Sequence, residues 1–517
     1  MNAIELNVFS SRIEAVCDEM GAVLRRTAFS PNIRDRLDYS CAIFDARGEL
    51  CAQAAHIPVH LGSMAFAMSG IVTHLPWRDG DMVVVNDPFL GGTHLPDVTV
   101  IAPMFVADEL VAFVANRAHH ADIGSESPGS MPLSTTLAEE GAIIAPTVLV
   151  RDGEIDRALL TELLGGEQSE VYGDFAAQVS ANRAGLQRLK SYIVSIGIAA
   201  WRDNLDELND YAERLAESAL RAIPDGDYTF QDCLDDDGAG NTNLIIAATV
   251  EVRDGRIHVN FEGTAAQTTG NVNCPLSVAA AGVYYVLRCL MPPQTPACAG
   301  AFRPVSLSAP PGSLLNAERP AAVAAGNVET STRVVDVICG ALAKALPELI
   351  PAASQGSMNN LAMGARGTRR WDYYETIGGG MGAGASGGGL SGVQTHMTNT
   401  LNTPIEVLER HYPLRVRRYA LRKDSGGMGA RFGGDGLIRE FEFLEAAQVT
   451  LLTERRRTAP WGLAGGGAGA RGENRLNGEL LPGKCSVTVK GGDRLTIATP
   501  GGGGWGNGNK AGIAGQG

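Results

Sequence analysis

Glycine is the residue that most constrains how this chain can fold. It accounts for 64 of the 517 residues, and in the second half it gathers in three runs, at residues 378–389, 465–472 and 501–506. Glycine loses more backbone freedom on folding than any other residue and weakens helices. The runs therefore predict turns and close approaches of the backbone, and not helices.

Helical periodicity is confined to the first half of the chain. Apolar residues at the start recur at spacings of three to five, which predicts an amphipathic helix that ends by residues 30–31, a Ser-Pro pair. A second helical region is expected over residues 172–222, ended by Pro-Asp-Gly at 224–226. Strand-like runs follow, for example at 244–252.

These patterns predict an α+β protein. We expect a mixed α/β region over residues 1–225 that carries a metal-binding hairpin. A β-rich, glycine-punctuated region should follow over residues 226–505. The last segment, 506–517, is expected to be a flexible tail.

Composition excludes several classes of protein. The net charge of −14 argues against a nucleic-acid partner, since phosphate binding depends on clustered Lys and Arg. No apolar run approaches a membrane span, and the acidic first 19 residues do not resemble a signal peptide. Nine cysteines without a CxxC pair exclude a zinc ribbon and favour a reducing compartment. We therefore expect a soluble cytoplasmic protein.

A group of candidate metal-binding residues lies on a predicted β-hairpin. His94 and Asp97 precede an apolar strand at 98–105, and a second strand leads into His119. With a turn near residues 107–108, the numbers of cross-strand partners sum to roughly 214–216. Asp97 would then lie opposite Ala118 or His119, with His94 beyond the same end.

Two imidazoles and one carboxylate at one end of a rigid hairpin predict a metal site. A catalytic metal needs about three protein ligands and an open position. Nitrogen and oxygen ligands suit zinc, manganese or iron better than calcium. His94, Asp97 and His119 are the expected ligands, although loop histidines satisfied by hydrogen bonds are the alternative interpretation.

Further residues near this cluster are candidates for acid–base catalysis. His120 could be an alternative ligand, a general base or a group that contacts the ligands, and Asp122 could also be a base. Asp38 is either an acid–base group or a charge paired with a neighbouring arginine. The pair His56 and His60 is expected to be structural, because no carboxylate lies close in sequence.

The glycine runs imitate nucleotide and nucleophile motifs. Residues 382–387 and 467–472 match GxGxxG, but neither match leads into an amphipathic helix. Residues 478–485 resemble a P-loop with Cys485 in place of the Ser or Thr that binds magnesium. A GxSxG match at 384–388 lacks the strand and helix of a nucleophile elbow. The chain alone offers no place for ATP.

Longer stretches resemble the hydantoinase B/oxoprolinase family. They include Gly-Gly-Thr-His-Leu-Pro-Asp at 91–97 and Asn-Arg-Ala-His-His-Ala-Asp at 116–122. Others lie at residues 38–45, 56–64, 326–331, 374–380 and 395–400. The resemblance covers essentially the whole chain.

This resemblance implies an enzyme of two subunit types. An A-type partner binds ATP and phosphorylates the carbonyl oxygen of a cyclic amide, and the B-type chain completes ring opening. Related carboxylase subunits bind a divalent metal through a His-x-x-Asp pair and a later histidine, which implies His94, Asp97 and His119 here. The division of labour would explain a metal site without a nucleotide site.

The sequence is compatible with three functions. The first is a subunit of an ATP-dependent cyclic-amide hydrolase of the hydantoin, 5-oxoproline or lactam type. The second is a subunit of a biotin-independent ketone carboxylase, although the chain lacks the large extension expected there. The third is a non-catalytic scaffold in which the histidines hold a structural ion. The sequence favours the hydrolase.

Overall fold

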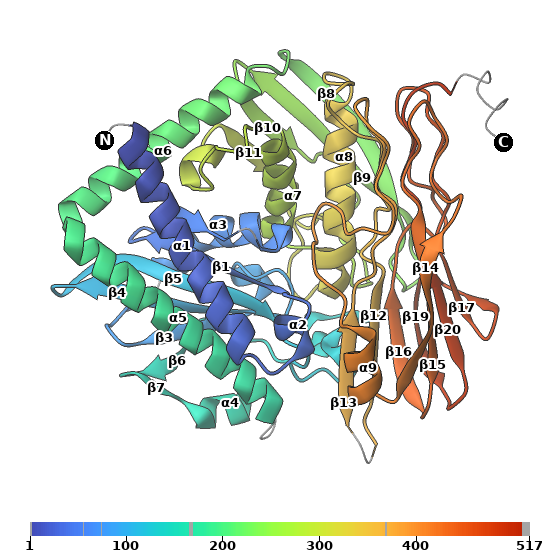
Figure 1. Ribbon diagram of the computed structural model, residues 1–517, viewed down its shortest axis with the longest axis horizontal. Helices are drawn as coiled ribbons and strands as arrows, with labels where there is room; N and C mark the ends of the chain where they lie inside the picture. Colours follow the sequence, from blue (N-terminus) through green and yellow to red (C-terminus); the bar gives the residue numbers. More distant parts are fainter. Residues whose placement is uncertain (1–2, 55, 74, 165–168, 368–369, 509–517) are drawn as a thin grey trace.

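The computed structural model describes residues 3–54, 56–73, 75–164, 169–367 and 370–508 (Figure 1). It has the predicted α+β fold, with helices gathered in the first two thirds and four β-sheets. The predicted tail at 506–517 falls outside the described residues from 509 onward. Among the helices of the described part, none has the length and apolarity needed to cross a membrane.

A seven-stranded sheet forms the centre of the N-terminal half. Its strands lie in the order β2-β1-β5-β4-β3-β6-β7, with antiparallel pairing throughout. Their bounds are β1 (Tyr39–Asp45), β2 (Leu50–Gln53), β3 (Met82–Val85), β4 (Asp97–Val106), β5 (Glu109–His119), β6 (Thr147–Arg151) and β7 (Glu154–Ile155). The central strands are buried along most of their length, which explains their continuous apolar runs.

Helices cover both faces of this sheet. On one face, α1 (Ala3–Thr27), α5 (Ser169–Ile196) and the first half of α6 (Ile198–Leu220) bury their apolar sides in one core (Figure 1). On the other face, α3 (Pro58–Val72) packs against aromatic and aliphatic strand residues and against α7 (Leu276–Cys289). The first predicted helix is confirmed. The second is two helices, because Gly197 takes a φ of 88° between them.

Shorter helical segments join these elements. They are α2 (Pro31–Arg34), α4 (Arg157–Leu164), η1 (Pro88–Leu90), η2 (Pro128–Ser130), η3 (Leu137–Glu140) and η4 (Ala299–Phe302).

A second sheet, of four strands, follows the first one in the sequence. Its order is β11-β10-β9-β8, with bounds β8 (Gly226–Asp236), β9 (Thr242–Arg253), β10 (Arg256–Asn260) and β11 (Val305–Ser308). Helices α7 and α8 (Ser331–Leu342) share a core with this sheet. A π-helical turn, η5 (Gly326–Thr330), precedes α8.

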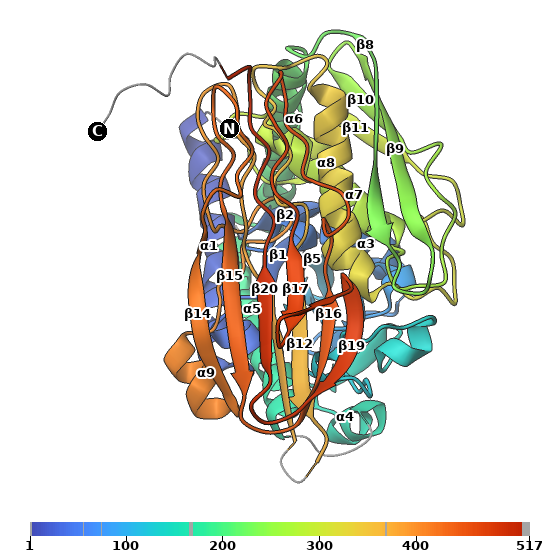
Figure 2. The same cartoon turned by 90° about the vertical axis from the view of Figure 1, so that its right-hand side faces the viewer.

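The C-terminal part forms a β-sandwich (Figure 2). One sheet has the order β13-β12-β16-β19 and the other β14-β15-β20-β17-β18, and their inner faces share one apolar core. The bounds are β12 (Asn360–Ala365), β13 (Trp371–Glu375), β14 (Leu414–Arg422), β15 (Gly436–Phe443), β16 (Ala447–Leu452), β17 (Glu473–Leu476), β18 (Glu479–Leu481), β19 (Lys484–Val489) and β20 (Arg494–Ala498). Helix α9 (Ile405–His411) lies against β14.

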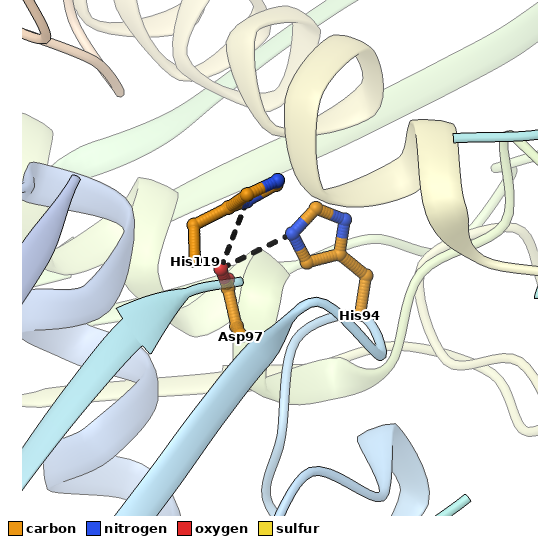
Figure 3. Close-up of side chains that lie close together, drawn as sticks. All are labelled: His94, Asp97 and His119. Atoms are coloured by element: carbon orange, nitrogen blue, oxygen red, sulfur yellow. Dashed lines mark ion pairs between the residues drawn. The ribbon is translucent and has the colours of Figure 1, made fainter. Parts of the chain in front are cut away.

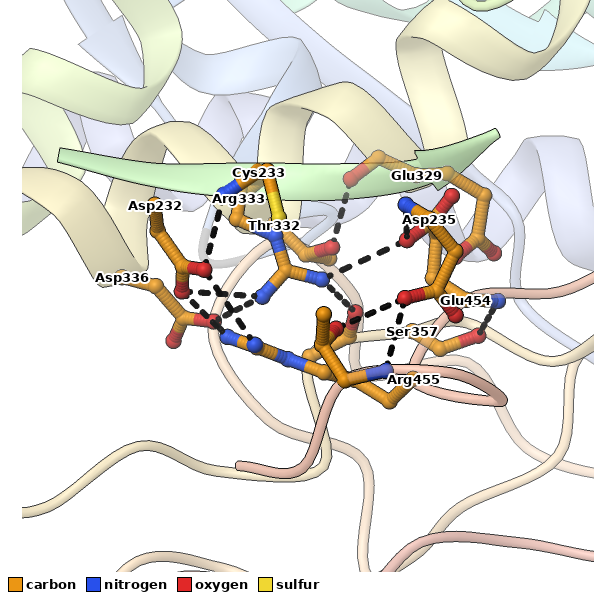
Figure 4. Close-up of polar contacts among 12 residues, drawn as sticks. Asp232, Cys233, Asp235, Glu329, Thr332, Arg333, Asp336, Ser357, Glu454 and Arg455 are labelled. Carbon is orange, nitrogen blue, oxygen red and sulfur yellow. Dashed lines mark hydrogen bonds and ion pairs between the residues drawn. The ribbon is translucent and has the colours of Figure 1, made fainter. Parts of the chain in front are cut away.

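A buried network of charges joins the sandwich to the helical part (Figure 4). The Arg455 guanidinium lies 2.6 Å from the Asp232 carboxylate of β8 and 2.7 Å from the Asp336 carboxylate of α8. Arg333 of α8 contacts both acids, at 3.3 and 3.1 Å. Removing one partner of such a network leaves an uncompensated buried charge, which is strongly destabilising. The network therefore fixes the sandwich against β8 and α8.

The glycine runs form loops that stand above the sandwich strands (Figure 2). Their backbones bond to one another, as in the bonds from Ala383 N to Gly503 O and from Gly504 N to Gly467 O, both at 2.9 Å. The approach is so close that a Cβ added to Gly382 would lie 1.8 Å from Ala352 O. The predicted close backbone approach is confirmed, and no helix forms in these runs within the described residues.

Gly382→Ala should therefore destabilise the protein, whereas Gly387→Ala should not. The alanine methyl at position 382 overlaps a backbone oxygen, and overpacking typically costs about 1–3 kcal/mol or more. A Cβ at position 387 meets nothing within 4 Å. Denaturant unfolding of both variants measures the difference. Equal free energies of unfolding would contradict the close approach.

Candidate metal centre

The β4–β5 hairpin brings Asp97 and His119 together. Asp97 is the first residue of β4, His119 is the last residue of β5, and the two are cross-strand partners. Ala107 and Asp108 form the turn with φ of 49° and 63°, the left-handed values that a tight two-residue hairpin turn requires. Of the two partners predicted for Asp97, Ala118 and His119, the structure gives His119.

His94 completes a cluster of three side chains (Figure 3). It precedes β4, and its Nε2 lies 3.2 Å from Asp97 Oδ1. His119 Nδ1 lies 3.3 Å from the same oxygen. One possible ligand atom from each residue lies within 4.8 Å of the others. This spacing is short enough for one ion to contact all three.

Unpaired buried atoms make this cluster suitable for a cation. His94 Nε2, Asp97 Oδ1 and His119 Nε2 are buried and have no hydrogen-bond partner. Buried polar atoms are normally paired, so unpaired ones require an explanation. Two nitrogens and a carboxylate oxygen match the ligands of zinc, manganese or iron. His94 Nδ1 donates to Ala324 O at 3.2 Å, which leaves Nε2 directed at the cluster.

The second carboxylate oxygen of Asp97 is held by three donors. Thr93 Oγ1 and Asn327 Nδ2 donate to Oδ2 at 2.5 and 3.1 Å, and His60 Nε2 lies 3.3 Å away. These contacts fix the carboxylate so that Oδ1 faces the two histidines. Asn327 comes from the π-helical turn before α8, so a distant segment orients the carboxylate.

His60 was expected to be structural, but the structure gives it a carboxylate partner. Ser40 Oγ accepts a hydrogen bond from Ile57 N at 3.2 Å and lies 3.1 Å from His60 Nδ1. Ser40 can therefore donate to Nδ1, which leaves the His60 proton on Nε2, directed at Asp97. Sequence spacing gives no signal for this contact, because α3 and β4 meet only in the folded chain.

Burial and mutual charge set the protonation of the cluster. Burial opposes charge on Asp97, but His94 and His60 override it and hold the pKa of the carboxyl well below its usual range. Burial lowers the pKa of His119. Burial acts the same way on His94, but the Asp97 carboxylate outweighs it and raises that pKa. Asp97 is therefore an anion and His119 a neutral imidazole, the forms that bind metals, whereas His94 must first lose the proton that Asp97 favours.

Tyr374 of β13 holds the His119 ring in place. The two rings are stacked, with centroids 4.6 Å apart and planes 8° from parallel. The Tyr374 hydroxyl donates to Asn360 Oδ1 at 2.6 Å, and Asn360 Nδ2 donates to Glu329 Oε1 at 2.7 Å. The Arg36 guanidinium lies over the Tyr374 ring, 4.8 Å from its centroid. Tyr374 opens the family-like stretch 374–380, but the sequence assigned it no role.

Asp38 lies beside the cluster. Its backbone oxygen accepts a bond from His119 N at 3.0 Å, and its carboxylate lies 3.9 Å from Arg36. Asp38, Asp97 and His119 line a cavity of about 20 Å³. That volume has room for one water molecule.

The structure places His120 and Asp122 away from the cluster of His94, Asp97 and His119. His120 packs on the Phe175 ring of α5, and its Nε2 lies 2.9 Å from Gln178 Oε1. Asp122 pairs with Arg370 and accepts a bond from Gly124 N at 2.8 Å. Successive residues of a strand point to opposite faces, which explains why His120 leaves the side on which His119 lies.

The model of the hydantoinase B/oxoprolinase family matches residues 2–508. The chain belongs to this family. An uncharacterized protein of Methanocaldococcus jannaschii is 40% identical over 98% of this chain and 91% of its own length. A 5-oxoprolinase of Arabidopsis thaliana is 38% identical over 98% of this chain, which spans only 42% of that protein.

A solved structure agrees with this family assignment. The ATP-dependent caprolactamase from Pseudomonas jessenii has a TM-score of 0.91 and 29% identity, covering 98% of this chain and 91% of that one. The hydantoinase B fold of the present chain is thus that of an enzyme family that includes hydrolases of cyclic amides.

The stacked tyrosine leads to a prediction about metal affinity. Tyr374→Leu should weaken metal binding roughly three- to tenfold, since an aromatic pair contributes about 0.5–1.5 kcal/mol beyond burial. Tyr374→Phe keeps the ring over His119 and should weaken it less. Competition titration against a chelator measures both affinities. Equal loss in the two variants would contradict a role for stacking.

Proposed function

We propose that this chain is the metal-binding subunit of an ATP-dependent cyclic-amide hydrolase. Its role is to complete ring opening after an A-type partner has phosphorylated the carbonyl oxygen of a hydantoin, 5-oxoproline or lactam ring. The observation that carries the proposal is the convergence of His94, Asp97 and His119, each with a buried, unpaired ligand atom.

His94 Nε2, Asp97 Oδ1 and one nitrogen of His119 would hold the ion. A divalent zinc, manganese or iron ion bound there would supply Lewis-acid activation for hydrolysis near neutral pH. Thr93 and Asn327, which donate to Asp97 Oδ2, keep the other oxygen available. Hydrogen bonds to the far oxygen of a ligating carboxylate typically orient it toward the ion.

We further propose Asp38 as the proton acceptor of the reaction. Asp38 lines the cavity beside His119, whereas His120 and Asp122 contact α5 and Arg370 instead. A general base must lie within reach of the proton that it removes. Of the three candidates, Asp38 is the one that lines this cavity, which supports the proposal.

The division of labour between two subunits has support in the chain itself. An amide carbonyl resists attack because its nitrogen donates electrons, and phosphorylation of the oxygen removes this protection. ATP is therefore needed, yet the glycine-rich matches to nucleotide motifs lie in loops bonded to one another. The chain corresponds to 42% of the plant 5-oxoprolinase, so an ATP-binding portion in the remainder fits the proposal.

The cluster leads to a prediction about metal content and activity. The wild type should carry about one divalent ion per chain, and the double variant His94→Ala, His119→Ala should carry none, because three ligands are needed. Plasma mass spectrometry measures both. His258→Ala is the matched control, since that histidine bonds to Ser306 and Ser308 away from the cluster.

Asp97→Ala separates catalysis from scaffolding. With an A-type partner, an intact complex that has lost ring opening supports catalysis, whereas a complex that fails to assemble supports a scaffold. Bicarbonate incorporation into product by the wild-type complex would identify a carboxylase instead.

Asp38 has its own test. Asp38→Asn keeps the shape of the side chain but removes its basic oxygen, so kcat for ring opening should fall roughly 10²- to 10⁴-fold. The metal content should stay at the wild-type level, because Asp38 is not a ligand. Steady-state kinetics of the complex and metal analysis of the same sample measure the two quantities. An unchanged kcat would exclude Asp38 as the base.

A further inference from the structure

Glu140 is a buried carboxylic acid close to the cluster. It is the last residue of η3, and none of its surface is exposed. Its Oε1 accepts three hydrogen bonds: one from Ser134 Oγ at 2.7 Å, and two from the backbone N–H groups of Val323 and Ala324, at 2.8 and 2.9 Å. The two backbone donors lie 183 and 184 residues away in the sequence, so this one oxygen joins two distant parts of the chain.

The segment that Glu140 holds carries the acceptor for His94. Ala324 O accepts a hydrogen bond from His94 Nδ1 at 3.2 Å. Figure 3 shows the His94 ring with one nitrogen toward Asp97 and the other on the far side. A histidine that binds a metal typically donates its second ring N–H to a fixed acceptor, which sets the tautomer and the direction of the ring. The position of Ala324 therefore sets the direction of His94 Nε2.

The Glu140 carboxyl group lies at the start of a helical turn. Ala324 begins this turn, which runs directly into η5. The N–H groups at the start of a helix have no acceptor within the helix, and a side-chain oxygen that accepts from them stabilises the turn. Without Glu140, the N–H groups of Val323 and Ala324 would be left buried and unpaired, which is unfavourable. A turn that moved to pair them would carry Ala324 O away from His94.

A second contact fixes the segment after η3 relative to the hairpin. Asn86 Nδ2 donates to Leu95 O and to Ala142 O, both at 2.9 Å. Asn86 Oδ1 accepts from Ile144 N at 2.7 Å. Because Leu95 directly follows His94, this amide holds the chain after η3 against the loop that carries the histidine. The carboxyl group at the end of η3 thus has a fixed position on the His94 side of the cluster.

We infer that Glu140 is a positioning residue for the metal site: it fixes the turn on which Ala324 accepts from His94, and so keeps His94 Nε2 directed at the ion. Glu140 touches neither the ion nor a substrate. The inference rests on the metal binding in the proposed function, and it adds a residue that lies outside the set of ligands.

Two substitutions separate the accepting oxygen of Glu140 from the shape of its side chain. Glu140→Leu removes the acceptor and should weaken zinc binding about tenfold, at the lower end of the loss typical for groups that support a ligand. Glu140→Gln keeps Oε1, and Oε2 has no hydrogen-bond partner to lose, so affinity should stay within about threefold of the wild type. Burial also raises the pKa of Glu140 to about 7, so the acid form that glutamine resembles is populated near neutral pH. Glu139→Leu, at the exposed neighbour, is the control.

A double-mutant cycle distinguishes positioning of His94 from a general loss of structure. Competition with a chelator measures zinc affinity in the wild type, Glu140→Leu, His94→Ala and the double variant. If Glu140 acts through His94, Glu140→Leu should change the affinity of the His94→Ala chain by less than about twofold, because the ring that it positions is gone. An equal tenfold loss in both backgrounds would overturn the inference. Glu140→Asp, whose carboxyl group is one methylene shorter, takes the same place in the cycle if Glu140→Leu does not fold.

The hydrogen bond of His94 can also be observed without an ion. In the chelator-treated chain with ¹⁵N-labelled histidine, the His94 Nδ1–H should give a resonance protected from exchange with solvent, assigned by its absence in His94→Ala. Glu140→Leu should remove this protection, whereas Glu140→Gln and Glu139→Leu should retain it. Full protection in Glu140→Leu would overturn the inference. A wild-type chain that shows this dependence on Glu140 but binds no zinc would overturn the proposed function, while the positioning of His94 by Glu140 would stand.

Discussion

The carboxylate of Asp97 is the interaction centre on which the site depends. Its two oxygens have different surroundings: Oδ2 is held by Thr93, Asn327 and His60, whereas Oδ1 faces His94 and His119 and has no hydrogen-bond donor. A buried anion is stable only when its neighbours compensate for lost water. The arrangement fixes one oxygen and keeps the other available for a cation.

Each part of the fold contributes one constraint on this centre. The first sheet supplies the hairpin that pairs Asp97 with His119. The π-helical turn before α8 supplies Asn327, and the sandwich supplies Tyr374, whose ring stacks on His119. The site thus lies where the first sheet, the turn before α8 and the sandwich meet.

The sandwich must therefore keep a fixed position relative to the rest of the fold. The arginine–carboxylate network around Arg455 joins the sandwich to β8 and α8, and the interlaced glycine loops stand on the sandwich at close backbone contact. The network is buried and the loops pack backbone against backbone, so both leave little freedom for rearrangement. A shift of the sandwich would move Tyr374 away from His119, so these remote features support the geometry of the cluster.

The sequence by itself determined the α+β class, the first helix, the register of the hairpin and the family, because these depend on local periodicity and on motifs within short stretches. Only the tertiary structure decided that His60 contacts Asp97, that Tyr374 stacks on His119, and that Asp38 rather than His120 or Asp122 lies beside the cluster. Those contacts join elements far apart in the chain. Because side chains alternate along a strand, His120 points to the face opposite His119. Spacing in the sequence does not predict which distant side chains come into contact.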